Sequence, residues 1–331
     1  MAHSSRVSLS LHCPSLISFA ALLCILAICS TLTRADEPAS QSAAVDLHWK
    51  FTPGQSLLVQ IERSQHTTTT APQRQVKRAS EFFTEWLMDV EKIDDRGTIF
   101  LSMSVRRARF VEHSPEGDRS LDTKADDTTP GALADEIRSL ARVAKSIKVS
   151  CQISAGGEVI GAELDAKAKQ VVETEPAGKL AKIFVSKETL RETFFRNLLS
   201  TRPERPVRPG DSWSDDLVIT RGTGEKQKLH RSFTYRGHNV RDGKTFDLIE
   251  TKGTLDLASL KQSWAEHGIQ IDSMDQDSRQ TELADLETHF PAVVEIKQSL
   301  KLTGTGGNGQ SVTQDDTIQT NITVSPYLAD K

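Results

Sequence analysis

Cysteine is scarce in this sequence, and most of it lies near the N terminus. The chain of 331 residues has four cysteines, of which Cys13, Cys24 and Cys29 fall in the first 30 residues. The rest of the chain keeps only Cys151, so a disulfide cannot form within it, and small disulfide-stapled folds are excluded. Cys151 lies in the alternating stretch Val149–Ile153, which predicts a buried core thiol; an intermolecular disulfide or a reactive thiol is the alternative.

Long apolar runs are lacking beyond about residue 35. The one long run is Leu16–Leu32, which Arg6 precedes and the small residues of Thr33-Arg34-Ala35 follow. This order predicts a secretory signal peptide that ends at about Ala35, with an uncleaved anchor or lipidation at Cys29 as alternatives. We therefore expect an exported protein of the periplasm or the extracellular space, whose mature chain does not span a membrane.

An excess of basic charge is lacking as well. Cleavage after Ala35 would leave 296 residues (331 − 35), which suits one large or two small domains. Removal of Arg6 and Arg34 leaves 39 basic residues (41 − 2) against 45 acidic ones, a net charge of −6. Charge of that sign argues against nucleic acid and anionic lipid as main partners, because both attract a basic surface. Envelope proteins or an apolar small molecule remain as classes of partner.

Apolar residues at every second position predict a mainly β protein. The clearest case is the pair of stretches 82–90 and 99–105, which the turn Asp94-Asp95-Arg96-Gly97 joins into a predicted hairpin. Residues 64–78 are rich in Thr, Gln and Arg and offer few apolar side chains, so we expect a mobile loop there. The other expected strands are 47–51, 57–61, 150–154, 159–164, 217–220, 229–236, 245–251, 253–257 and a final pair that ends at Val324.

Apolar residues spaced by three and four positions predict a few helices between the β-rich regions. Leu133, Ile137, Leu140 and Ala144 share one helical face, and Leu190, Phe194 and Leu198 share another. The expected helices are 131–148, 165–175 and 186–200.

Two turns with the same pattern suggest an internal repeat. Pro53-Gly54-Gln55-Ser56 matches Pro209-Gly210-Asp211-Ser212 at an offset of 156 (209 − 53), and a strand, a glycine turn and another strand follow each. We predict two duplicated antiparallel β modules of sandwich or open-barrel type; coincidence is the alternative, because Pro-Gly turns are common where strands begin. The predicted organisation is a signal peptide at 1–35, a flexible lead-in at 36–45, a first module at 46–164, a helical connection at 165–205 and a second module at 206–331.

These turns, together with the signal peptide and the Gly156-Gly157 hairpin, carry a family resemblance. With Arg208-Pro209-Gly210-Asp211-Ser212-Trp213 before a final β half, the chain resembles a family of exported bacterial proteins that is known only as a domain of unknown function. The resemblance spans most of the mature chain and implies a β-rich envelope protein. That family has no agreed active site, so it assigns a role to no residue here.

One stretch resembles an esterase motif. Gly210-Asp211-Ser212 is similar to the nucleophile block of the GDSL-type esterases, which needs an apolar strand before it. The residues before it are instead Pro206 to Pro209. The late Asp-x-x-His of those enzymes also fails, because Asp285 and His289 are one residue too far apart. A structural turn explains the pattern better.

Patterns for metal or cofactor binding are lacking. The mature histidines show no His-x-His or His-Glu-x-x-His spacing. The acidic run Asp272, Asp275 and Asp277 lacks the glycine and the final glutamate of a calcium loop. Gly304–Gly309 lies between predicted strands and suits a hairpin turn, not a phosphate-binding loop. We therefore predict no catalytic, metal-ligating or cofactor-binding residue.

Three classes of function remain open. The first, favoured by the lack of catalytic patterns, is a non-enzymatic structural or interaction protein of the cell envelope. The second is a carrier of an apolar or lipid-like ligand, since one apolar stripe would line a cavity if the sheet formed an open barrel, although such a stripe is more often plain core. The third is a hydrolase with an unrecognised site. The candidate ligand-lining residues are Phe82, Trp86, Met88, Leu101 and Met103.

Overall fold

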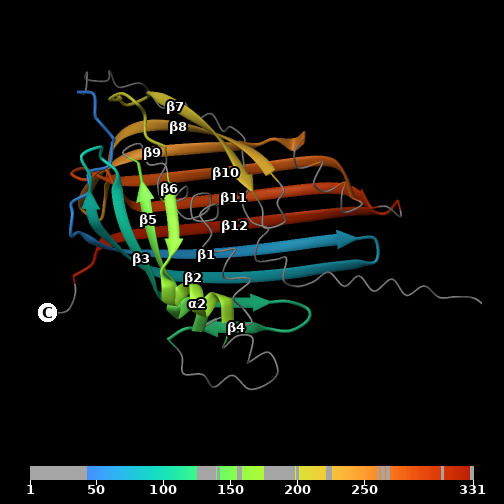
Figure 1. Ribbon diagram of the computed structural model, residues 1–331. Helices are drawn as coiled ribbons and strands as arrows, with labels where there is room; N and C mark the ends of the chain where they lie inside the picture. Colours follow the sequence, from blue (N-terminus) through green and yellow to red (C-terminus); the bar gives the residue numbers. More distant parts are fainter. Residues whose placement is uncertain are drawn as a thin grey trace, which may run out of the picture.

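The fold comes from a computed structural model, drawn as a ribbon in Figure 1. It describes residues 43–124, 139, 142–154, 159–174, 198, 201–220, 226–258, 261, 265, 269–306 and 309–328. The predicted signal peptide lies outside these residues, and so does the predicted helix at 186–200 except for Leu198. Of the predicted helix at 131–148, residues 139 and 142–146 are described as helical.

One antiparallel sheet of 12 strands dominates the described chain. The strands follow the order β6-β5-β3-β2-β1-β12-β11-β10-β9-β8-β7, and β4 pairs with β3 beside this path. The sheet is not closed, because β6 and β7 end the order. The strands are β1 (Ser56–Ala71), β2 (Arg74–Ile93), β3 (Ile99–His113), β4 (Arg119–Asp122), β5 (Lys148–Ile153), β6 (Val159–Leu164), β7 (Ser212–Thr220), β8 (Lys226–Arg241), β9 (Lys244–Leu255), β10 (Ile269–Asp285), β11 (Pro291–Gly306) and β12 (Ser311–Pro326).

The two halves of the sequence share this one sheet. Strand β1 pairs with β12 from Leu57 opposite Pro326 to Thr70 opposite Thr313, so the earliest and the latest described strands lie side by side (Figure 1). The predicted mainly β class is confirmed. The two β-rich halves are continuous with each other, and neither the sandwich form nor the duplication is established by this arrangement.

The predicted mobile loop at residues 64–78 is wrong. Strands β1 and β2 run through it as a long hairpin that turns only at residues 72 and 73, with His66 opposite Ala79 and Thr70 opposite Gln75. Four consecutive threonines, Thr67–Thr70, suit a pleated strand because their side chains are β-branched. Pairing with β12 on the other side adds a second ladder of hydrogen bonds. Ladders on both sides outweigh the lack of apolar side chains.

Other expectations differ in detail. Residues 47–51 were expected to form a strand, but only Val45 near them makes a β-bridge, to Val207. The expected hairpins at β2–β3 and β5–β6 are confirmed, and so is the helix near 165–175, which is α2 (Ala166–Thr174). Asp165 begins that helix, because its side chain accepts a hydrogen bond from the amide of Ala168 at 2.7 Å.

The face of the sheet that carries the apolar core is called the inner face here, and the opposite face the outer face. Val59, Met88, Met103, Cys151 and Ile322 come from five strands, belong to one core cluster and are each at most 1% exposed. The predicted burial of Cys151 is confirmed, and burial raises the pKa of its thiol to about 12. A second apolar cluster covers β8 and β9 and consists of Leu47, Val207, Phe233, Tyr235 and Ile249.

Candidate functional site

The five candidate ligand-lining residues lie on the inner face, and four of them are in the packed core. Trp86, Met88, Leu101 and Met103 are between 0 and 9% exposed and belong to the main core cluster. Met88 lies opposite Met103 in the register of β2 and β3. Phe82 is half-buried on the same face and lies opposite Phe110.

A groove of about 460 Å³ lies where β3, β2, β1 and β12 run side by side. Most of its lining comes from alternate residues that share the outer face, as the registers Glu62–Phe83, Phe83–Arg109 and Glu62–Asn321 show. The lining residues are Glu62, Arg63, Ser64, Glu81, Phe82, Phe83, Arg107, Arg109, Gln319 and Asn321. Of the five predicted residues, only Phe82 is among them.

An aromatic ring and a fixed guanidinium form one wall of the groove. The Arg107 guanidinium lies over the ring of Phe83, 5.4 Å from its centroid. Asp122 holds Arg107 through two hydrogen bonds of 3.2 and 2.6 Å, a bidentate geometry that fixes the direction of the guanidinium. The hydrogen bond to Arg107 also lowers the pKa of Asp122. Phe83 is therefore held under a side chain whose charge is already compensated.

The other polar groups of the groove balance one another in charge. Glu81 and Arg109 approach to 3.6 Å across β2 and β3, and both are about half exposed. Glu62, Arg63 and Ser64 add a carboxylate, a guanidinium and a hydroxyl from β1. Gln319 and Asn321 add two amides from β12. Carboxylates accept hydrogen bonds, guanidinium groups donate them, and amides and hydroxyls do both. The groove therefore offers both kinds of hydrogen-bonding group and no strong excess of one charge.

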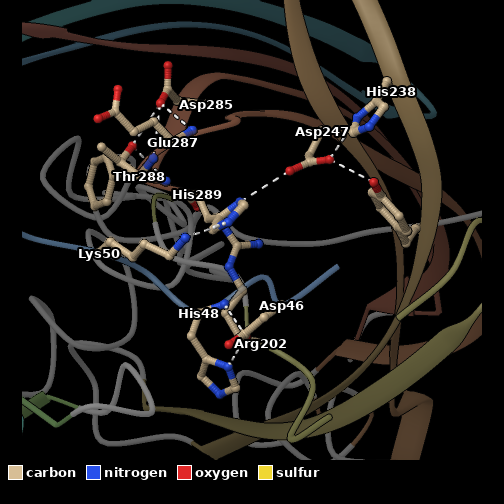
Figure 2. Close-up of polar contacts among 12 residues, drawn as sticks. Asp46, His48, Lys50, Arg202, His238, Asp247, Asp285, Glu287, Thr288 and His289 are labelled. Carbon is tan, nitrogen blue, oxygen red and sulfur yellow. Dashed lines mark hydrogen bonds and ion pairs between the residues drawn. The ribbon is translucent and has the colours of Figure 1, made fainter. Parts of the chain in front are cut away.

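A second group of polar residues surrounds a buried carboxylate between β8, β9, the turn after β10 and the segment before β1; Figure 2 shows it. We call it the Asp247 cluster; it comprises Lys50, Tyr235, His238, Asp247 and His289. Tyr235, Asp247 and His289 are buried, whereas Lys50 and His238 are exposed. Asp247 is fully buried. Its Oδ1 accepts a hydrogen bond from the hydroxyl of Tyr235 at 2.7 Å and lies 3.1 Å from Nδ1 of His238, while its Oδ2 lies 3.2 Å from Nδ1 of His289.

His289 completes a chain of polar contacts. Its Nε2 lies 3.4 Å from Nζ of Lys50. Burial, followed by the positive charge of Lys50, lowers the pKa of His289, so the ring is neutral at neutral pH. In the tautomer that fits both neighbours, Nδ1–H donates to Asp247, and the lone pair of Nε2 accepts from the Lys50 ammonium.

A tight turn places His289 in this position. The backbone of His289 has a φ of +54°, in the left-handed region that a non-glycine residue seldom adopts. Asp285 holds the turn, since its Oδ1 accepts from the amides of Glu287 and Thr288 at 3.0 and 3.1 Å. Although burial opposes it, the hydrogen bonds from Lys244 and from these amides hold the pKa of Asp285 at about 2.

A buried ion pair lies next to the cluster. The Arg202 guanidinium donates to Glu282 at 2.5 Å and to the carbonyl oxygen of His289 at 2.9 Å, and the side chains of Arg202 and Glu282 are 2 and 0% exposed. Arg202 also lies over the ring of Trp49, at 5.4 Å. Segment 201–207, which overlaps the end of the predicted helical connection at 165–205, is therefore held to β10 by an ion pair.

The Asp247 cluster has two of the three parts of a hydrolytic triad, a histidine and a carboxylate that orients it. The third part is not in place among the described residues, because the position that a nucleophile would take at Nε2 is held by Lys50. The nearby hydroxyl of Thr288 lies 3.2 Å from Asp285 and accepts from the amide of Phe290. The arrangement pairs buried charges and holds the segment before β1 against β9 and the turn after β10.

The sequence patterns did not point to this cluster. Its members come from positions between 50 and 289, and no fixed spacing connects them. The only sequence signal for the cluster was the pair Asp285 and His289, which is a poor match to an esterase motif. In the structure, the carboxylate that contacts Nδ1 of His289 is that of Asp247 and not that of Asp285.

The described residues show neither a metal site nor a membrane-spanning helix. Within them, no group of three or more His, Cys, Asp and Glu side chains is placed to hold a metal ion. None of the helices in the same residues is long and apolar enough to cross a membrane.

Comparisons with known proteins leave the family open. No family model matches the chain, and no curated protein matches its sequence. An outer membrane channel from Pseudomonas putida F1 is 9% identical, covers 88% of this chain and 100% of its own, and has a TM-score of 0.28. DynF from the dynemicin biosynthesis pathway of Micromonospora chersina is 10% identical, covers 92 and 96%, and has a TM-score of 0.20.

A further solved structure belongs to a protein family that is defined only as a domain of unknown function. A DUF1329 family protein from Desulfovibrio piger is 9% identical, covers 84% of this chain and 88% of its own, and has a TM-score of 0.14. It agrees only loosely with the resemblance to an exported family of unknown function. Similarities at this level carry no functional conclusion for this chain.

Proposed function

We propose that this chain is an exported, non-enzymatic binding protein, and that the outer-face groove between β3 and β12 holds its ligand. The observation that carries the proposal is the groove itself, whose volume of about 460 Å³ is in the range that small ligands occupy. Its wall is prepared in advance, because Asp122 fixes Arg107 and Arg107 covers Phe83. A site that is already ordered loses little entropy when a ligand binds.

The chemistry of the groove favours an uncharged ligand that is rich in hydroxyl groups, such as a short saccharide chain. Glu81 and Arg109 are close enough to compensate each other, and Asp122 compensates Arg107, so a charged ligand would find no unmatched partner in either pair. A hydroxyl both donates and accepts, which matches the carboxylate of Glu62 on β1 and the amides of Gln319 and Asn321 on the neighbouring strand β12. The ring of Phe83 would contact the apolar C–H face of a sugar.

The Asp247 cluster supports a role without catalysis. Its histidine has a carboxylate on one nitrogen and an ammonium group on the other, so the ring is already engaged on both sides. A general base must be able to reach the proton that it removes. The hydrolase alternative would require Lys50 to leave Nε2 before any chemistry began.

The carrier of an apolar ligand remains a second proposal. What favours it is that the half-buried inner-face side chains Phe82 and Ile61 continue the stripe of Trp86 and Met88 beyond the closely packed core. Binding there would require the core to open at its edge. Loss of lipid binding by Trp86→Ala in a folded protein would support this alternative over the groove.

A glycan array probed with the mature chain, residues 36–331, tests the groove. We expect binding to neutral oligosaccharides, and Phe83→Ala is expected to weaken it at least about tenfold, because aromatic anchors dominate small sites. Phe100→Ala is the matched control: Phe100 is a half-buried ring of β3 that Lys92 covers at 4.2 Å, and it lies outside the groove. Equal binding by wild type and Phe83→Ala, or no bound glycan at all, would contradict the proposal.

A further inference from the structure

Three parts of the chain that are far apart in sequence meet at the Asp247 cluster. Segment 45–51 attaches to the turn after β10 through the amide of Lys50, which donates to the carbonyl oxygen of Thr288 at 2.8 Å. The same segment attaches to segment 201–207 through two backbone hydrogen bonds between Val45 and Val207, of 2.8 and 2.9 Å. His289 lies between them and is 6% exposed.

The charges around His289 balance only while its ring is neutral. Lys50 from segment 45–51 and Arg202 from segment 201–207 are positive, whereas Asp247 from β9 and Glu282 from β10 are negative. Protonation of His289 would add a third positive charge beside two buried carboxylates, at a site where Lys50 alone of the charged groups is exposed. It would also place an N–H on Nε2 opposite the Lys50 ammonium, so that two donors face each other at 3.4 Å.

We propose that proton binding by His289 loosens segment 45–51 from the sheet, so that the attachment of this segment depends on pH. The proposal rests on contacts of the Asp247 cluster and is independent of the groove. At neutral pH, Lys50 is held by the lone pair of a neutral ring. On acidification the contact between Lys50 and the protonated ring becomes repulsive. Glu282 does not compensate the new charge, because its carboxylate is already paired with Arg202.

The remaining titratable groups near His289 modify this effect without reversing it. His238 on β8 approaches the other oxygen of Asp247 at 3.1 Å, but its side chain is more than half exposed and is in contact with water. Tyr235 on β8 donates to Asp247, and burial together with that carboxylate raises the pKa of Tyr235, so it stays neutral. Asp46 is 2.5 Å from His48, at the exposed side of the segment, and Lys244 holds Asp285.

The direction of the pH dependence follows from linkage. The pKa of His289 lies below the ordinary value of 6.5 in the folded chain, so an open segment would bind a proton more readily than a closed one. The attachment is therefore strongest above about pH 6.5, and it weakens as the pH falls below that value until the folded group also becomes protonated. No loss is expected on the alkaline side of this window from His289.

Hydrogen exchange measured by mass spectrometry on the mature chain tests the proposal. We expect the protection factor of peptides that cover residues 45–51, corrected for intrinsic exchange, to fall about tenfold between about pH 7.5 and about pH 5. In His289→Gln the side chain cannot be protonated, so the fall should disappear. His238→Gln is the matched control: it removes another histidine that contacts the same carboxylate and should keep the fall.

Two results would overturn the proposal. One is constant protection of residues 45–51 in wild type over this pH range, and the other is an undiminished fall in His289→Gln. If His289→Gln does not fold, Lys50→Met tests the proposal instead. Removal of the opposing ammonium should make the pH-dependent fall in the protection factor of residues 45–51 at least about threefold smaller. An unchanged fall in Lys50→Met would then contradict the role of the Lys50 contact.

Discussion

The turns at Thr52–Ser56 and Arg208–Ser212 can be compared bond by bond. In the first, the amide of Gly54 donates to Val90 on β2 at 2.7 Å, and Val90 donates back to Gln55 at 2.8 Å. In the second, the amide of Gly210 donates to Tyr235 on β8 at 2.8 Å, and Tyr235 donates back to Asp211 at 3.0 Å. Both glycines have positive φ angles, 82° and 95°. The matched sequence patterns therefore form the same local structure.

What packs behind each turn differs. The strands after the first turn bury Val59, Met88 and Met103 in an apolar cluster. Those after the second turn bury a smaller apolar cluster that includes Phe233 and Tyr235. They also bury charged groups, namely Asp247, and Arg231 beside Asp215 at 2.6 Å. A turn therefore follows from local sequence, whereas the interior depends on which distant segments the strands meet. A shared turn is consistent with the predicted duplication, which stays a prediction.

Removal of one charge from the buried ion pair of the second half should have the largest effect on stability. Glu282→Ala would leave the buried Arg202 guanidinium without its carboxylate, and we expect the free energy of unfolding to fall by about 3–5 kcal/mol. Urea denaturation at neutral pH measures it. The double variant Arg202→Met with Glu282→Leu should regain most of the loss, because it buries no charge. A loss below about 1 kcal/mol in Glu282→Ala would show that the pair is not desolvated.

Substitution of either turn glycine should have a smaller effect, of similar size in the two halves. Gly54→Ala and Gly210→Ala should each lower the free energy of unfolding by about 1–2 kcal/mol, because a side chain at positive φ is strained. An added Cβ would meet nothing within 4 Å at either site, so steric contact does not separate the two variants. Thermal unfolding of both variants checks this. A difference of more than about 1 kcal/mol between them would mean that the turns are not equivalent.

The residue after each glycine should give the smallest effect. The Gln55 side chain accepts from the amide of Thr52 at 3.3 Å, whereas the Asp211 carboxylate accepts from the amide of Arg208 at 2.9 Å. We expect Asp211→Ala to cost about 1 kcal/mol and Gln55→Ala about half of that, because a charged acceptor makes the stronger hydrogen bond. Thermal denaturation of the two variants measures the difference between their losses of stability. A larger loss in Gln55→Ala than in Asp211→Ala would contradict the expected strengths of the two hydrogen bonds.

The parts of the fold that local sequence determines could be predicted. The hairpin through Asp94–Gly97 and the buried position of Cys151 follow from alternation and turn residues. Strand pairing at Thr67–Thr70 could not be predicted, because its stability comes from β2 and β12 on both sides and not from apolar content. The groove and the Asp247 cluster were missed for a related reason: Lys50, Asp247 and His289 are brought together only by the complete sheet.

The pairing of β1 with β12 has a consequence for the order in which the chain folds. The hydroxyl of Thr67 on β1 donates a hydrogen bond to the carboxylate of Asp316 on β12 at 2.5 Å, and the two residues are 249 positions apart in the sequence. Such distant contacts make folding slow, because a long loop must close before any of them forms. Strand β1 can pair with β2 early, but its other edge stays open until β12 arrives. We therefore expect this seam to form late, and partly folded chains to be prone to wrong strand pairing at the edge of β1.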